Sequence, residues 1–266
     1  MTILEDIIAH KKLIYATIAE TITVKDLEKR TTFNREVVSL SESLLDKNRT
    51  GIIAEFKRKS PSKGIINSSA SVGEVTSGYF SEGASGVSIL TDNHYFGGSP
   101  ADLTIARSNK LLPILRKDFI INEYQVIESK AIGADAILLI AAALRKTEIH
   151  GLAQLAASIG LEVLFEIHEQ KELDKVNQYV NIIGVNNRNL KTFEVNTDIS
   201  FEIADEIPSG FIKISESGIS SALIINELRM AGYNGFLIGE KFMLTADPVK
   251  TFSTFIKDLA CNNDKI

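Results

Sequence analysis

Eight short runs rich in Val, Ile and Leu recur after Gly51, and helix-like segments separate them. The runs are GIIAEF, GVSIL, LPILRKDF, DAILLIAA, EVLFEIH, NIIGVNN, GFIKISE and GFLIGE. Their spacing suits one strand, one helix and two short loops, and nothing in it indicates paired hairpins. Continuously apolar strands that alternate with helices are typical of a parallel sheet covered by helices. Eight such units predict an α/β fold, the (β/α)8 TIM barrel.

An open doubly wound sheet is the structural alternative, but a nucleotide-binding fold of that kind has a glycine-rich turn after its first strand. The chain has EFKRKSPSKG at that point, which lacks the G-x-G-x-x-G pattern. Before the first run, apolar residues from Leu4 to about Lys47 recur at spacings of three and four, the period of amphipathic helices. We therefore expect one barrel domain over residues 1–266, in which residues 1–47 form an N-terminal helical extension.

The charge balance favours a small-molecule partner. The 266 residues carry a net charge of −5 with acids and bases interspersed, so we expect no surface for nucleic acid or for an anionic membrane. Cys261 is the only cysteine, which excludes a disulfide framework and a cysteine metal cluster. The first residues mix lysines with acids, unlike a signal peptide, and no stretch approaches a membrane span. These features predict a cytoplasmic protein.

Charged and amide side chains gather at the ends of the predicted strands. Barrel enzymes place their chemistry at the carboxyl ends of the strands and in the loops that follow. The polar residues at these ends are Glu55, Lys57, Lys117, Asp118, Glu166, His168, Asn186, Arg188 and Glu216. Period-two alternation puts most of them in line with inward-facing apolar residues, as for Leu115 and Lys117. Because an unpaired buried ion costs several kcal/mol, such a cluster must be paired or functional.

Carboxylates, lysines, an arginine and an amide at one mouth suit acid–base chemistry on an anionic substrate. A divalent-metal site is the rival use of the carboxylates. It is the weaker interpretation, because Lys57 and Lys117 already supply positive charge there, and we expect no metal. The other histidines have no ligand spacing with His168, which we interpret as a supporting or surface residue.

Seven segments in order along the chain resemble those of the indole-3-glycerol-phosphate synthase family, the tryptophan-pathway barrel. They are IIAEFKRKSPSKG, ILTDNHYFGGS, LPILRKDFIINEYQ, GADAILLIAA, IIGVNNRNL, ISESGI and GFLIGE, within about Gly51 to Met243. The resemblance is to the monofunctional form, with its helical N-terminal extension. It implies a carboxy-lyase that needs no cofactor, converts 1-(2-carboxyphenylamino)-1-deoxyribulose 5-phosphate to indole-3-glycerol phosphate, CO2 and water, and is a monomer.

The same resemblance assigns roles to the residues at the strand ends. Lys117 matches the acid for ring closure, and Glu166 matches the base for dehydration. Lys57 matches a lysine that pairs with the substrate carboxylate, and a second proton donation during dehydration is open to it. Glu55, Asn186 and Glu216 match residues that orient the lysines and the sugar hydroxyls. The residues that match the lining of the substrate pocket are Ser60, Phe119, Leu139, Arg188 and Leu190.

The substrate phosphate is expected after the seventh and eighth strands, where barrels bind phosphate with backbone N–H groups. The residues of this expected site are Ser217, Gly218, Ile238, Gly239 and Glu240. Glycine lets the oxygens approach the amides, although Gly218 and Gly239 are also ordinary turn residues. Lys241 departs from the family pattern, which has a small residue there. The polar loop KSPSKG is either a lid over bound substrate or an ordinary connection.

Two functions of other classes stay open at this point. Another phosphate-binding barrel, such as a sugar-phosphate isomerase, would share the fold and the phosphate loops. It would not need Lys57, Lys117 and Glu166 together with an apolar wall for an anthranilate ring. A non-catalytic barrel scaffold is the other alternative, and it is expected to have lost at least one of those three charges.

Overall fold

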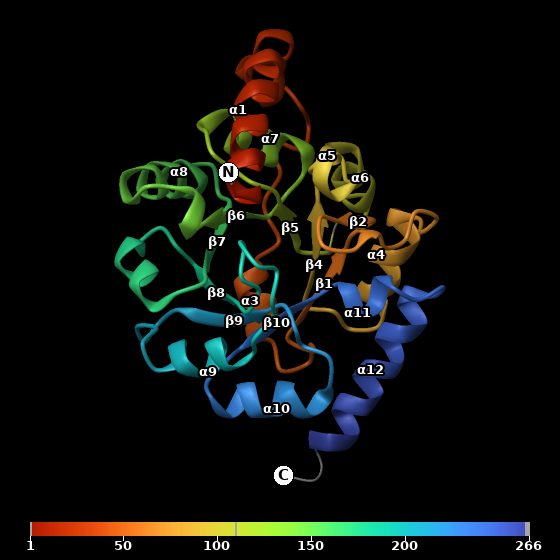
Figure 1. Ribbon diagram of the computed structural model, residues 1–266. Helices are drawn as coiled ribbons and strands as arrows, with labels where there is room; N and C mark the ends of the chain where they lie inside the picture. Colours follow the sequence, from red (N-terminus) through yellow and green to blue (C-terminus); the bar gives the residue numbers. More distant parts are fainter. Residues whose placement is uncertain (1, 110, 264–266) are drawn as a thin grey trace.

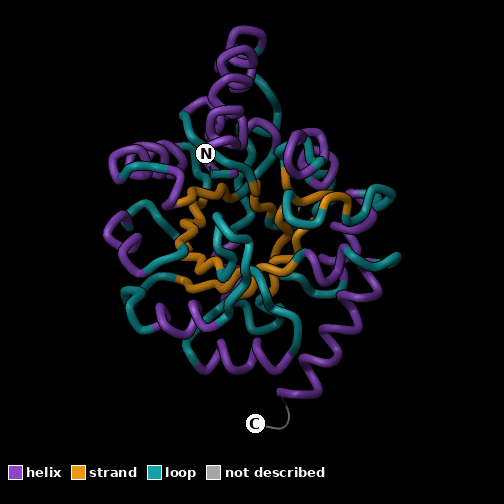
Figure 2. The backbone as a smooth tube through the Cα atoms, in the orientation of Figure 1, coloured by secondary structure: helices purple, strands orange, loops and turns teal. Residues whose placement is uncertain are grey.

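The computed structural model describes residues 2–109 and 111–263. Eight parallel strands close into a barrel and helices surround it (Figures 1 and 2). In order around the barrel the strands are β1 (Ile52–Phe56), β4 (Gly86–Leu90), β5 (Ile114–Lys117), β6 (Ala136–Ile140), β7 (Glu162–Ile167), β8 (Ile182–Asn186), β9 (Ile212–Glu216) and β10 (Gly235–Ile238). Each lies within one of the eight predicted runs, so the predicted (β/α)8 barrel is confirmed.

The outer layer follows the strands in sequence. It consists of α4 (Val72–Ser81), α6 (Pro100–Ala106), α7 (Glu123–Ile132), α8 (Lys146–Ser158), the 3-10 helix η2 (Gln170–Lys175), α9 (Asp198–Ala204), α10 (Ala222–Met230) and α12 (Pro248–Asn263). Three short helices lie in loops: α5 (Asn93–Phe96), η1 (Ala141–Ala143) and α11 (Glu240–Met243). Within the described residues, no helix combines the length and apolar character that crossing a membrane requires.

Alternation along the strands divides the apolar core into two parts. Inward-facing side chains such as Ile53, Leu115 and Leu164 fill the barrel, while outward-facing ones such as Val87 and Phe165 pack against the helices. The inward rows end in polar residues at the carboxyl ends of the strands, as the alternation predicted. The barrel interior is therefore filled with apolar side chains, and charged and amide side chains lie at the carboxyl ends of the strands.

The N-terminal extension contains α1 (Ile3–Thr21), α2 (Val24–Glu28) and α3 (Leu40–Leu45). Helices were expected from about Leu4 to Lys47, but the chain between α2 and α3 has turns and extended backbone instead. Leu40 and Leu44 of α3 enter the inner core, and Gly86 and Gly235 leave the space for them. Side chains of α3 thus fill the amino-terminal end of the barrel.

Helix α1 is fixed to the opposite end of the barrel by a buried cation. Lys11 is 2% exposed, and its Nζ lies 2.9 Å from Asp92 and 2.5 Å from Asp118. Asp118 follows β5 directly and also accepts from Arg116, which is completely buried. Because each charge is paired, the cluster secures the extension beside Lys117 without leaving a buried ion alone.

The loop after β1 contains a small hairpin that the spacing of the runs did not indicate. Its two strands, β2 (Lys59–Ser60) and β3 (Gly64–Ile65), pair antiparallel. Gly64 has a φ of +67°, a backbone conformation that suits glycine at this turn. The hairpin is joined to the neighbouring loop by a hydrogen bond from Lys59 Nζ to the carbonyl oxygen of His94.

Candidate active site

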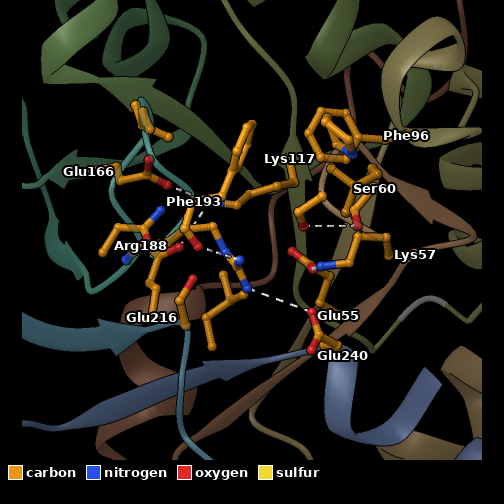
Figure 3. A pocket seen from close by; sticks show the side chains of 18 of the residues that line it. Glu55, Lys57, Ser60, Phe96, Lys117, Glu166, Arg188, Phe193, Glu216 and Glu240 are labelled. Carbon is orange, nitrogen blue, oxygen red and sulfur yellow. Dashed lines mark hydrogen bonds and ion pairs between the residues drawn. The ribbon is translucent and has the colours of Figure 1, made fainter. Parts of the chain in front are cut away.

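A pocket of about 540 Å³ opens at the carboxyl ends of the barrel strands. Most of the sequence-predicted residues meet there: Glu55, Lys57, Ser60, Lys117, Phe119, Glu166, Asn186, Arg188, Leu190, Glu216, Ser217, Gly218, Ile238, Gly239 and Glu240 all line it. They come from strands or loops all around the barrel, and Figure 3 shows the charged side chains converging on one space. Among the described residues, no three His, Cys, Asp or Glu side chains are grouped as they would be to hold a metal ion.

A lysine between two carboxylates forms the centre of the site. Lys117 Nζ lies 2.5 Å from Glu166 Oε2 and 2.8 Å from Glu216 Oε2 (Figure 3). The two carboxylate side chains are only 3% and 2% exposed. Strands β5, β7 and β9 bring these three residues together although they are far apart in the sequence.

Burial and mutual charge set the protonation of this triad. Burial alone would lower the pKa of Lys117, but the two carboxylates outweigh burial and raise that pKa above its usual range. Burial would raise the pKa of Glu166, but the Lys117 ammonium and His168 hold it below its usual range. Burial raises the pKa of Glu216 to about 7, and the charge on Glu166 adds to the rise against the pull of Lys117. The triad therefore keeps an ammonium beside one firmly ionised carboxylate.

Glu55 and Lys57 form a second charged pair at the end of β1. Lys57 Nζ donates to Glu55 Oε1 over 2.6 Å. The Glu55 side chain is 5% exposed and the Lys57 side chain 16%, so the pair is sheltered but reaches the pocket. Gly239 makes this position possible, because a Cβ there would lie 2.7 Å from both Cβ and Oε1 of Glu55. The glycine after β10 thus provides space for the Glu55 carboxylate.

Polar groups from the loops after β8 and β10 meet across the mouth. Asn186 Oδ1 accepts from the backbone N–H of Arg188 over 3.0 Å. The Arg188 guanidinium donates to the carbonyl oxygen of Phe193 and lies 3.6 Å from Glu240 Oε2 (Figure 3). Glu240 Oε1 also contacts Lys63 Nζ at 2.7 Å. One carboxylate therefore links cations from two loops.

The backbone directly after β9 has an unusual conformation. Ser217 and Gly218 have φ values of 66° and 76°, so two successive residues adopt the left-handed conformation. The Asn187 side-chain amide donates to the carbonyl oxygen of Ser217 over 3.0 Å and holds the turn. Successive residues in such conformations can turn their N–H groups towards an anion.

The rest of the pocket wall is largely apolar. It includes Phe96 and Phe119, whose ring centroids are 6.1 Å apart, and side chains from α1, β6, β10 and the loop after β8. The members from strands, loops and α1 are Ile3, Leu4, Ile7, Leu90, Leu138, Ile140, Leu190, Phe193, Leu237 and Leu244. A flat aromatic group can therefore lie between this wall and the lysines.

The prediction that Leu139 lines the pocket is wrong. Leu139 is completely buried in the outer core, beneath the helices, because successive residues of β6 face opposite sides of the barrel. Leu138 and Ile140 face inward and line the pocket instead. Every residue of DAILLIAA after its first is apolar, so the sequence has no polar residue that would mark which set faces inward.

Residues of α1 in the pocket were missed by the sequence reasoning. Ile3, Leu4 and Ile7 lie on the apolar face of a helix that was assigned only to the extension. Their helical spacing was a visible signal for a buried face, but not for what that face covers. His168 does not line the pocket and lies next to Glu166, with its Nε2 3.4 Å from Glu166 Oε1, as a supporting residue would.

Comparison with known proteins agrees with this geometry. A family model described as indole-3-glycerol phosphate synthase matches residues 4–255, which includes most of the N-terminal extension. The indole-3-glycerol phosphate synthase of Bacteroides thetaiotaomicron is 46% identical over 256 residues, covering 96% of this chain and 98% of that protein. That of Carboxydothermus hydrogenoformans is 40% identical over 228 residues, covering 84% of this chain and 86% of that protein.

Solved structures share the fold at low sequence identity. A 3-hexulose-6-phosphate synthase from Salmonella typhimurium superposes with a TM-score of 0.60 at 10% identity, covering 80% of this chain and 99% of that one. A tryptophan synthase α-subunit from Pyrococcus furiosus gives 0.59 at 13% identity, covering 79% of this chain and 98% of that one. These likenesses concern the barrel alone.

Proposed function

Since the chain belongs to the indole-3-glycerol phosphate synthase family, we propose how its pocket residues divide the work of the family's reaction. The enzyme is a carboxy-lyase of tryptophan biosynthesis. It closes, decarboxylates and dehydrates 1-(2-carboxyphenylamino)-1-deoxyribulose 5-phosphate, and it forms indole-3-glycerol phosphate, CO2 and water. Neither the isomerase nor the scaffold alternative has support beyond the shared barrel.

The observation that carries this assignment is the Lys117 ammonium held between Glu166 and Glu216. A raised pKa for the lysine and a lowered one for Glu166 keep the acid protonated and the base ionised over a wide pH range. Each group is thus in the form its step requires before substrate arrives. The same short contacts oppose proton release, so we expect bound substrate to weaken them.

Substrate binding uses both the charged and the apolar side chains of the pocket. We expect the carboxyphenyl ring to lie on the apolar wall, with its carboxylate against Lys57. The phosphate then reaches the turn at Ser217 and Gly218 and the backbone N–H groups after Gly239. Arg188 also lines the pocket and supplies positive charge. The support for this orientation is that cation, apolar wall and glycine-rich turns occur in one pocket.

Ring closure begins when the aromatic carbon bearing the carboxylate attacks the substrate ketone. As this carbon–carbon bond forms, Lys117 donates a proton to the ketone oxygen, which becomes a hydroxyl. The carbon–carboxylate bond then breaks, CO2 leaves, and its bonding electrons restore the aromatic ring. We expect Glu216, which contacts Lys117, to hold that lysine in position, and Asn186 to orient the sugar hydroxyls. A low-dielectric pocket strengthens each of these interactions relative to water.

Dehydration completes the indole ring. The new hydroxyl leaves as water with a proton from Lys57 or Lys117, and Glu166 takes a proton from the neighbouring carbon. Two protons are donated and one is taken back, so each turnover consumes one proton, as loss of CO2 from a carboxylate requires. Glu55 holds Lys57 in position until it acts.

The direct test is to incubate the purified protein with the carboxyphenylamino substrate and to follow indole fluorescence. Absence of signal at saturating substrate would remove the proposed function. The roles are separated by Glu166→Gln, which keeps the shape of the side chain and removes the base. In single-turnover experiments this variant should release CO2 faster than it forms indole. A parallel loss of CO2 and indole would contradict the assignment of Glu166.

We further infer that the enzyme works as a monomer in the cytoplasm and that residues 1–266 fold as one unit. The support for one unit is that α1 and α3 of the extension are built into the two ends of the barrel. Sedimentation equilibrium gives the oligomeric state, and a dimer at micromolar concentration would overturn that part. A single thermal transition seen by both calorimetry and circular dichroism is expected for one folding unit.

A further inference from the structure

His168 lies immediately after β7 and two residues beyond Glu166, so alternation directs both side chains to the same side of the strand. Its side chain is 11% exposed, and it is not among the described residues that line the pocket. The imidazole therefore contacts the catalytic carboxylate without access to bound substrate. The proposed mechanism gives this buried titratable group no task.

The imidazole is placed between two carboxylates. Nε2 lies 3.4 Å from Glu166 Oε1, and Nδ1 lies 3.9 Å from Glu172 Oε2. Both ring nitrogens are shielded from solvent, and neither makes a hydrogen bond of normal geometry within the described residues. Imidazole with one N–H faces only one carboxylate with a donor, whereas imidazolium faces both. The ring is therefore held between Glu166 and Glu172, with one carboxylate facing each nitrogen.

Glu172 at η2 keeps this ring in place. Its Oε2 accepts from the backbone N–H of His168 over 2.7 Å and from that of Glu169 over 3.3 Å. The Glu172 side chain is 9% exposed, so these bonds are largely protected from water. The backbone after β7 is therefore fixed, and the imidazole has little freedom to turn away from Glu166.

The two oxygens of Glu166 face different cations. Oε2 contacts Lys117 at 2.5 Å, and Oε1 faces His168. If Oε1 were unsupported, the carboxylate could rotate and present either oxygen to either partner. Support from both sides fixes its plane, which matters for a base that must reach one hydrogen of bound substrate.

We propose that His168 is a positioning residue for Glu166, holding its Oε1 so that Oε2 stays directed at Lys117 and the reacting carbon. This inference rests on the proposed role of Glu166 as the base. His168 does not touch substrate in this scheme. Its effect is on the orientation and the charge of the carboxylate that does.

The charged groups around the ring determine how the variants depend on pH. Glu166 faces it from β7, Glu169 faces it from just before η2, and Glu172 faces it from within η2. Lys117 reaches Glu166 from β5 on the far side of the carboxylate. Asn186 of β8 also bonds Glu166, without charge. Removal of the imidazole therefore takes one of two cationic neighbours from Glu166 and makes its ionised form less favourable.

The test compares His168→Gln with His168→Asn. The amide nitrogen of Gln can occupy the place of Nε2 and donate to Glu166, whereas the shorter Asn side chain reaches only the place of Nδ1. We expect His168→Asn and His168→Ala to lower kcat about ten- to a hundredfold with KM within about threefold. His168→Gln should recover at least about fivefold of that loss. His150→Gln on α8 is the matched control, because His150 is exposed and its ring packs against that of Tyr179, away from the pocket lining.

The dependence of kcat on pH adds a second measurement, which would not change if His168 had only a structural role. In His168→Ala and in His168→Gln the acidic limb of kcat should shift to higher pH, because neither side chain carries the positive charge. An unshifted limb, or equal kcat values for the Gln and Asn variants, would overturn the inference. If the Ala variant fails to fold, the Gln and Asn comparison still decides.

The experiments distinguish an incorrect positioning role for His168 from an incorrect base role for Glu166. If Glu166→Gln slows CO2 release and indole formation equally, Glu166 is not the dehydration base and the premise is lost. If Glu166→Gln slows indole formation selectively while the His168 variants behave as the parent, only the positioning role is lost. Nitrogen-15 spectra of the parent protein provide an independent check, since Glu166→Gln should shift the His168 Nε2 signal and leave that of His150 unchanged.

Discussion

Gly184 on β8 lies directly against Oε1 of Glu216 on β9, so that a Cβ at position 184 would overlap this oxygen. Oε1 is buried and has no hydrogen-bond partner among the described residues, while Oε2 accepts from Lys117. The glycine thus provides the space in which the carboxylate faces the pocket. An inward-facing position in a barrel strand is thus left without a side chain, because the carboxylate of its neighbour Glu216 occupies that space.

Gly184→Ala should therefore move Glu216 and lower kcat about tenfold or more, because Lys117 loses one of its two fixed partners. Gly151→Ala is the matched control, since Gly151 is in α8 and a Cβ there meets nothing within 4 Å. That substitution should stabilise the protein by about 0.5–1 kcal/mol and leave kcat unchanged. Steady-state kinetics and thermal unfolding of both variants measure the contrast. Equal kcat for Gly184→Ala and the parent would contradict the account.

The raised pKa of Glu216 makes stability depend on pH. Its pKa is about 7 in the folded protein against an ordinary value of 4.5, so between these limits the folded state binds the extra proton. The free energy of unfolding therefore has this contribution in full below about pH 4.5 and loses it as pH rises through about 7. At about 1.4 kcal/mol per pKa unit, the loss is roughly 3 to 4 kcal/mol.

Urea unfolding of the parent and of Glu216→Gln at pH 5 and pH 8 measures this contribution as a difference. The parent should lose more stability than the variant over the interval, and Glu216→Gln should be the more stable protein at pH 8. Glu148→Gln, at a mostly exposed pair with Arg145, is the control and should follow the parent. Parallel profiles for the parent and Glu216→Gln would show that Glu216 is ionised throughout.

Lys117→Met should abolish turnover while it leaves substrate affinity within about tenfold, since a contact made mainly in the transition state affects kcat more than binding. It also leaves Glu166 and Glu216 buried without their shared cation, so one of them must take up a proton. Stopped-flow binding and single-turnover kinetics separate these effects, with the exposed Lys146→Met as control. A variant that keeps kcat and loses affinity would refute the acid role.

Gly239→Ala and Gly218→Ala should fail in different ways. A Cβ on Gly239 would displace Glu55 and, through it, Lys57. Gly239→Ala should therefore both lower kcat and raise KM. Gly218 has a φ of +76° and no such neighbour in the catalytic cluster, so Ala there should cost about 1–2 kcal/mol of stability and mainly raise KM. An unchanged kcat in Gly239→Ala would mean that Glu55 can relax.

Lys11→Met should destabilise the protein by about 3–5 kcal/mol, because it leaves Asp92 and Asp118 buried without their common cation. Lys12→Met, one residue along α1 on its exposed side, should stay within about 0.5 kcal/mol of the parent. Chemical denaturation of both variants tests this. Equal stabilities would mean that the neighbouring Arg116 neutralises Asp118 on its own.

The sequence by itself determined the barrel and the charged residues of its mouth. Both depend on local periodicity: apolar runs of strand length repeat eight times, and polar residues continue the inward-facing rows at their ends. Such patterns are readable because neighbouring positions on a strand must face opposite sides. Alternation correctly predicted that Lys117, Glu166 and Glu216 face the barrel interior, because each lies two residues after an inward-facing apolar residue.

Other features were decided only by the tertiary structure. Leu139 was misplaced because a strand that is apolar on both faces does not show which face is inward. The closure of α1 over the pocket depends on Lys11 and its two carboxylates, which lie far away in sequence. The opposite pKa shifts of Glu166 and Glu216 arise from burial and from distances to Lys117. The burial of a side chain and its distance to a distant residue are set only when the chain folds. They cannot be predicted from the order of residues along the chain.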